Sequence, residues 1–219
     1  MDKVKAVQRL REVAYENFTE RLLAQDLAPG QFVTQRELIA LTRMPLGVIR
    51  ELVPILEADG LIKTVPQRGM QVAHVDVDLI RNAFQFRLFL EREAAAQFVR
   101  TVTDQTLAAW RTRHEEMISA AKNSMSEALV AKAQDLDWSL HDEIIDSLGN
   151  DIISKAHKVN SIKIRLIRQS LTRLDPYLVV PVMEEHLQVL DAFATRDPQR
   201  AADALGAHIL NAKSRALQR

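Results

Sequence analysis

The chain has 219 residues, and its 29 basic and 29 acidic side chains give a formal net charge of 0. Hydrophobic residues make up 47% of the sequence and charged residues 26%, which is typical of soluble globular proteins. The absence of cysteine excludes a disulfide framework, a cysteine-based zinc site and thiol catalysis. Neither a membrane-spanning run of about 18 apolar residues nor a signal-peptide core is present, so we expect a cytoplasmic protein.

Turn residues and apolar stripes divide the first 75 residues into three short helices and a β-hairpin. Thr34 and Glu37 have the spacing of a capping box, and Pro45 and Gly60 suit the two ends of a helix. The predicted helices cover residues 5–25, 34–42 and 45–59. Two β-branched runs flank the turn "PQRG" and predict the hairpin.

This order of elements is typical of a winged helix-turn-helix, in which the third helix enters the DNA major groove. The alternative is a small α+β module that dimerises or packs on the rest of the chain. We therefore predict a DNA-binding domain over residues 1–75.

The remaining residues, 76–219, have a helical pattern throughout. The predicted helices cover residues 77–100, 103–122, 125–148, 150–174, 177–195 and 198–217. Short loops make successive helices antiparallel neighbours. The predicted fold class is therefore mainly α, with the N-terminal winged helix-turn-helix joined to an all-α antiparallel helical bundle.

Spacing brings some of the six histidines into one candidate site. Asp137 and His141 are four apart and share one helix face. His186 and His208 each lie eleven residues from Asp197, so an antiparallel helix pair places them at the same height, roughly 16 Å from its turn. They are either hydrogen-bonded core histidines or metal ligands. Three imidazoles and one carboxylate suit Zn²⁺, Ni²⁺ or Mn²⁺.

The other histidines are predicted to be structural or solvated. His114 stands among charged residues in "WRTRHEEM", and His157 lies between two lysines. We therefore expect both side chains at the surface.

Residues 27–74 resemble the DNA-binding domain of the GntR family of bacterial transcription regulators. The matching pieces are "APG", "QREL", "VIRELVPILEADGLI" and "PQRG". The resemblance implies contacts to DNA from Arg36, Arg50 and Arg68, with Gly69 permitting a close approach of the wing. The full predicted set is Thr34, Arg36, Leu46, Gly47, Arg50, Gln67, Arg68 and Gly69.

The recognition helix departs from the family pattern. Leu46 stands where the family usually has a base-reading arginine, and Gly47 replaces a hydroxyl residue. A leucine can contact a thymine methyl group but cannot donate to guanine. Pro54 lies inside the same helix, where proline removes a backbone hydrogen bond and often causes a kink.

Residues 79–217 resemble the FCD effector domain of the FadR subfamily. The pattern is carried by "FRLFLEREAAAQF", "DWSLHDEIIDSLGN" and "EEHLQVLDAFATRDPQRAADALGAHI". The resemblance implies a domain over residues 76–219 that binds a small carboxylate effector through a divalent metal ion. The implied metal ligands are Asp137, His141, His186 and His208.

Two arginines are candidates for the effector site. Arg87 matches an arginine that often lines the cavity in this subfamily, although it could instead form an ion pair with Glu91 one turn away. Arg165 is the weaker candidate.

The resulting hypothesis is a ligand-responsive transcription repressor that binds operator DNA as a homodimer and responds to a small organic acid. One alternative is a metalloenzyme in which the ion activates water. No general base is indicated for such an enzyme, because Glu143 and Glu185 are expected to point away from the ligand face. The second alternative is a regulator whose metal is purely structural.

Overall fold

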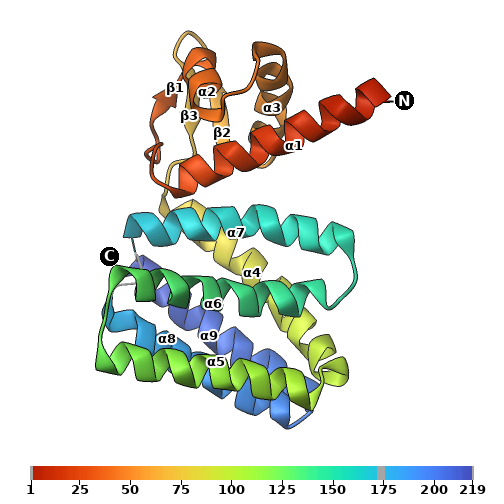
Figure 1. The fold of residues 1–219 in the computed structure, drawn as a ribbon, viewed down its shortest axis with the longest axis vertical. Helices are drawn as coiled ribbons and strands as arrows, with labels where there is room; N and C mark the ends of the chain where they lie inside the picture. Colours follow the sequence, from red (N-terminus) through yellow and green to blue (C-terminus); the bar gives the residue numbers. More distant parts are fainter. Residues whose placement is uncertain (1, 172–175, 219) are drawn as a thin grey trace. The chain divides into compact units, whose positions relative to one another are not determined.

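The computed structural model describes residues 2–171 and 176–218 (Figure 1). Contacts group them into two compact units. The first extends to Leu79 and includes Arg165–Ser170 from helix α7 (Asp151–Leu171). The second contains the other described residues. Within the described part of the chain, no helix is long and apolar enough to cross a membrane.

The three helices predicted for the first unit are present. They are α1 (Asp2–Leu23), α2 (Gln35–Thr42) and α3 (Leu46–Ala58). Their apolar stripes form the core of the unit, which includes Phe18, Leu22, Leu38, Ile49, Leu52 and Leu56. The capping box is also confirmed. The Thr34 hydroxyl accepts from the Glu37 amide at 3.2 Å, and the Glu37 carboxylate accepts from the Thr34 amide at 2.6 Å.

Helix α3 differs from its prediction in detail. Pro45 has extended backbone angles and occupies the N-cap, so the helix begins one residue later than expected. Pro54 does not end the helix, which continues to Ala58. Gly60 has φ +69° just beyond the C-cap Asp59, the left-handed conformation that glycine adopts without strain.

The hairpin is confirmed, but it belongs to a three-stranded sheet. Strands β2 (Ile62–Val65) and β3 (Gly69–Val72) pair antiparallel, and the short strand β1 (Phe32–Val33) pairs with the other edge of β3. The predicted helices-plus-hairpin arrangement therefore lacked one strand. Gly69 has φ +93°, and a Cβ there would lie 2.8 Å from the carbonyl oxygen of Val33. This glycine lets β1 approach the turn closely.

The helices of the second unit agree with the prediction within a few residues. They are α4 (Val77–Thr101), α5 (Asp104–Asn123), α6 (Glu127–Asp146), α7, α8 (Pro176–Ala194) and α9 (Pro198–Leu217). The end of the predicted 150–174 helix lies outside the described residues. Helix α5 packs on α6 and α8, and α8 packs on α9. In Figure 1, α5 and α6 lie in front of α8 and α9.

The turn between α8 and α9 aligns these two helices. The Asp197 carboxylate caps α9 by accepting from the amides of Gln199 and Arg200 at 2.9 and 3.1 Å, and Pro198 begins the helix. The cap satisfies amides that the helix itself leaves unpaired. As a result, positions equally distant from Asp197 face one another across the helix pair.

Candidate metal centre

Three helices bring the four predicted metal ligands together. Asp137 and His141 come from α6, His186 from α8 and His208 from α9. All four side chains are buried, and each offers one ligand atom within 4.8 Å of the others. The equal distances of His186 and His208 from the turn thus place them at one height, as predicted.

The ligand atoms form a tight group around Asp137. His186 Nε2 lies 3.2 Å from Asp137 Oδ1 and 3.3 Å from His208 Nε2. His141 Nε2 lies 3.8 Å from Asp137 Oδ1, is buried, and has no hydrogen-bond partner among the described residues. Tetrahedral ligands about 2.1 Å from a zinc ion are separated by about 3.4 Å. The spacing and the orphaned nitrogen therefore fit a cation.

The other ring nitrogen of each imidazole has its own partner outside this group. His141 Nδ1 lies 2.6 Å from Glu91 Oε2 in α4, and His208 Nδ1 lies 2.8 Å from Glu185 Oε2 in α8. An ionised carboxylate only accepts, so these two Nδ1 atoms donate and their Nε2 atoms keep a lone pair. Such partners orient metal-binding histidines and raise their basicity.

The two supporting carboxylates are ionised at neutral pH. Burial alone would raise the pKa of Glu91, but the charge of Arg87 and hydrogen bonds from His141 and His157 hold it well below its usual value. Burial also opposes ionisation of Glu185, but hydrogen bonds from His208 and Arg215 lower its pKa to about 2. Both are therefore acceptors for the imidazoles.

The imidazoles themselves are neutral at neutral pH. Burial lowers the pKa of each of four histidines to about 4, namely His114, His141, His186 and His208. Neutral imidazole is the form that binds a metal ion. The cluster therefore presents three nitrogen lone pairs and one carboxylate to the same small space.

Two histidines that were predicted to be exposed are buried. His114 is 0% exposed and hydrogen-bonds His186, while His157 is 3% exposed and lies 3.2 Å from Glu91 Oε1. Their charged sequence neighbours suggested the surface, but those neighbours occupy other faces of the same helices. For His114, the signal lay in the apolar stripe formed with Leu107 and Trp110.

Glu185 lies off the ligand face, as predicted, but it has a role that the prediction did not include. Its place next to His186 suggested that it pointed away from the site. The carboxylate does leave the ligand face of α8, but it crosses to α9, where it binds His208 and receives Arg215 at 2.7 Å. Glu143 is exposed, as expected.

Arg87 forms the ion pair considered for it and also lines a cavity. Its Nε donates to Glu91 Oε1 at 2.7 Å, so the predicted ion pair is present and buried. Its Nη2 is buried without a hydrogen-bond partner in the described residues. The guanidinium lines a narrow cavity beside His141, with no room for a water molecule. Arg165 does not line this cavity.

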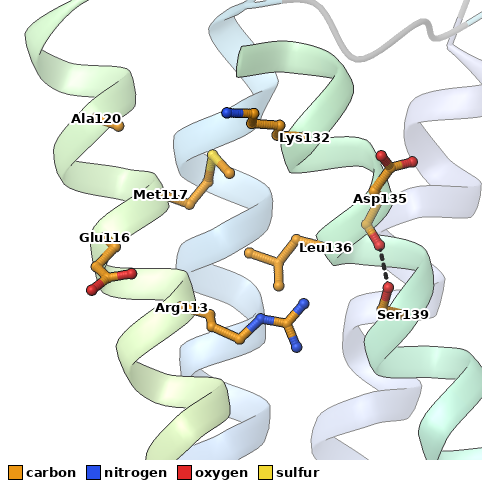
Figure 2. A pocket seen from close by; sticks show the side chains of 8 residues that line it. All are labelled: Arg113, Glu116, Met117, Ala120, Lys132, Asp135, Leu136 and Ser139. Carbon is orange, nitrogen blue, oxygen red and sulfur yellow. Dashed lines mark hydrogen bonds between the residues drawn. The ribbon is translucent and has the colours of Figure 1, made fainter. Parts of the chain in front are cut away.

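A larger groove lies between α5 and α6, as Figure 2 shows. Its volume is about 380 Å³, and Arg113 extends across it toward α6 beneath Leu136. Two basic residues, Arg113 and Lys132, and two acidic residues, Glu116 and Asp135, line it. The lining therefore has no net charge that would attract an organic acid.

The predicted DNA-binding residues lie on α2, α3 and the hairpin of the first unit. Those on the surface are Thr34, Arg36, Leu46, Gly47, Arg50, Gln67 and Arg68, whereas Gly69 is half-buried. Within the described part of the chain, Arg36 and Arg50 have no ion-pair partner. The guanidinium of Arg68 lies 4.0 Å above the ring of Phe32. Thr34 is already engaged in capping α2.

Comparison with known proteins agrees with this fold. The FCD domain family matches residues 82–211. The HTH-type transcriptional regulator BphR of Paraburkholderia xenovorans is 23% identical over 205 residues, which cover 93% of this chain and 83% of BphR. The structure of Escherichia coli McbR/YncC has a TM-score of 0.75 at 17% identity, covering 95% and 97% of the two chains.

A further solved structure, the metal-free FCD domain of TM0439, is similar to the second unit. Its TM-score is 0.54 at 18% identity, and the match covers 67% of this chain and 96% of that domain. The curated relatives BphR and the Nta operon transcriptional regulator of Aminobacter aminovorans are transcriptional regulators, not enzymes. The chain belongs to the GntR family of helix-turn-helix transcription regulators that carry a C-terminal FCD domain.

Proposed function

We propose that this regulator represses transcription as a homodimer on operator DNA in the cytoplasm, and that a small carboxylate effector controls it. The effector binds through a divalent ion held by Asp137, His141, His186 and His208. The observation that supports this proposal best is the buried cluster of three Nε2 lone pairs and one carboxylate.

The exposed arginines of the first unit support the DNA-binding part. Arg36 and Arg50 are available to phosphates or bases because no acidic side chain in the described residues neutralises them. We divide the chain at residues 75 and 76, in the loop between β3 and α4. Palindromic operators require two-fold symmetric proteins, which supports a homodimer.

The charge of the cluster supports an anionic effector. The cluster and its partners hold three carboxylates, those of Asp137, Glu91 and Glu185, and two guanidiniums, those of Arg87 and Arg215. Neutral histidines therefore leave one net negative charge. A divalent ion changes this to one net positive charge. A single carboxylate then neutralises the site, and buried charge is stable only when it is compensated. The unpaired Nη2 of Arg87 adds a donor for this anion.

One observation favours a purely structural metal instead. The cavity at Arg87 has no room for a water molecule, and four protein ligands complete a tetrahedral zinc site. Effector binding therefore requires side chains around Arg87 to move, whereas a structural ion requires no movement.

The experiment begins with the metal content of the purified full chain and with DNA selected from a random library. Fluorescence anisotropy then measures affinity for the selected DNA at fixed salt, with metal-free and Zn²⁺-loaded protein and a panel of mono- and dicarboxylates. We expect at least one acid to weaken DNA binding only with metal. His186→Ala combined with His208→Ala should abolish the response but keep DNA binding, while His74→Ala should change neither.

Each alternative to metal-anchored effector binding predicts a different result in this experiment. A carboxylate response that persists in the metal-free double variant contradicts metal-anchored effector binding. Metal that raises stability without any carboxylate response supports the structural role.

A further inference from the structure

His114 contacts the metal-ligand cluster but is not one of its four members. Its Nε2 lies 3.0 Å from His186 Nδ1, and both side chains are 0% exposed. We propose that His114 is a positioning residue that fixes the tautomer of His186, so that His186 Nε2 keeps its lone pair for the metal ion. The inference rests on the proposed metal site, although the tautomer can be tested without metal.

The direction of the hydrogen bonds follows from one backbone group. His114 Nδ1 lies 2.7 Å from the carbonyl oxygen of Trp110, one turn earlier in α5. A carbonyl oxygen only accepts, so His114 Nδ1 carries the proton. The Nε2 of a neutral His114 is then an acceptor, and His186 must donate to it from Nδ1. This leaves His186 Nε2 without a proton.

Asp137 competes for the same proton. Its Oδ1 lies 3.2 Å from His186 Nε2, so the other tautomer of His186 would donate to this carboxylate. That tautomer would occupy the metal-binding lone pair with a proton. It would also place two lone pairs 3.0 Å apart between His114 and His186, both buried without a donor. His114 therefore disfavours the tautomer that blocks metal binding.

His114 accepts a hydrogen bond from the Nδ1 atom of a predicted ligand, a role that carboxylates have at His141 and His208. Glu91 and Glu185 accept from His141 and His208, and each brings a negative charge. His114 accepts from His186 without adding a charge to the buried cluster. A fourth carboxylate would need a further buried cation. The neutral chain of hydrogen bonds from His186 through His114 to the Trp110 carbonyl, which we call the relay, avoids this need.

The tautomer is tested in the metal-free full chain by long-range ¹H–¹⁵N NMR of the imidazoles. We expect His186 to carry its proton on Nδ1 in the wild type. In His114→Phe it should shift to Nε2. His114→Gln supplies an amide oxygen as acceptor and should retain the wild-type tautomer. His74→Phe removes an exposed histidine outside the cluster and serves as the control, with His186 unchanged. An Nε2 proton on wild-type His186, or an Nδ1 proton in His114→Phe, overturns the proposal.

Zn²⁺ affinity, measured by competition with a chromophoric chelator, gives the second readout. Loss of an outer partner typically costs 10–100-fold in metal affinity. We expect a loss of about this size in His114→Phe and recovery to within a few-fold in His114→Gln. Equal losses in both variants mean that His114 only fills space, and they contradict the relay. If the wild type binds no Zn²⁺ but has the expected tautomer, the proposed metal site fails and the relay stands.

Discussion

At the scale of single residues, the candidate site depends on side chains outside the four predicted ligands. His141, His186 and His208 each have the Nδ1 atom held by a different acceptor, namely Glu91, His114 or Glu185. These acceptors leave every Nε2 free to bind a cation. The same Nδ1 contacts would be lost if any ring rotated, so they also restrict the imidazoles to one orientation.

Glu185 tests this dependence most directly, because its neighbour supplies a matched control. Glu185→Gln keeps the shape and an acceptor oxygen but removes the negative charge that strengthens His208 and pairs with Arg215. We expect Zn²⁺ affinity to fall about tenfold or more in chelator competition. Glu184→Gln changes an exposed carboxylate whose partner is Lys122 and should leave the affinity within twofold. Equal effects would show that Glu185 acts only through overall charge.

Sequence reasoning brought together the four side chains of the cluster but not their supporting residues, and the reason is physical. Asp137 and His141 share a helical turn, and His186 and His208 share a helix pair, so local geometry relates them. Glu91 lies 50 residues from His141, and His114 lies 72 residues from His186. Only the packing of several helices brings such residues together, so no local pattern predicts these contacts.

At the scale of elements, sequence signals that lie within one helix predicted that helix correctly. The pairing of strand β1 with a distant segment was not predicted. Thr34 and Asp197 correctly marked helix starts because a cap is a local hydrogen-bonding requirement. Strand β1 has only two residues, which is too short for a periodic sequence pattern. It is a strand because it pairs with β3.

Substitutions at two glycines of the first unit measure two different effects on stability, namely backbone strain at Gly69 and helix propensity at Gly47. Gly69→Ala forces a Cβ against the Val33 carbonyl at a positive φ, so we expect a loss of about 1–3 kcal/mol in the free energy of unfolding. Gly47→Ala has nothing within 4 Å and lies in the first turn of α3, where alanine should add up to about 1 kcal/mol. Urea denaturation measures both. A neutral Gly69→Ala would mean that β1 is not held against β3.

At the scale of the whole molecule, the site involves every helix of the second unit. Glu91 lies in α4, His114 in α5, His141 in α6 and His157 in α7, and the remaining members belong to α8 and α9. An ion bound by the four ligands would connect five helices directly or through one partner, and would reach α7 through two, because His157 contacts Glu91 and Glu91 contacts His141. Metal binding and the stability of this unit should consequently change together.

Acidification tests that link. Four buried histidines have pKa values near 4 in the folded chain against 6.5 when solvated, so between these values the unfolded chain binds more protons. Stability must therefore rise with pH across this window and be lost as pH falls through it. For the metal-free protein we expect urea denaturation to show a loss of several kcal/mol between pH 7.5 and 4.5, at about 1.4 kcal/mol per pKa unit.

Excess Zn²⁺ should raise the stability at pH 7.5 and make its decline on acidification steeper, because protons displace the ion from the same nitrogens. His74→Ala removes a histidine outside the cluster and should follow the wild-type curve. A metal-free protein equally stable at pH 7.5 and 4.5 would show that the histidines are not held neutral. If Zn²⁺ raised stability equally at both pH values, the ion would be bound elsewhere than at Asp137, His141, His186 and His208.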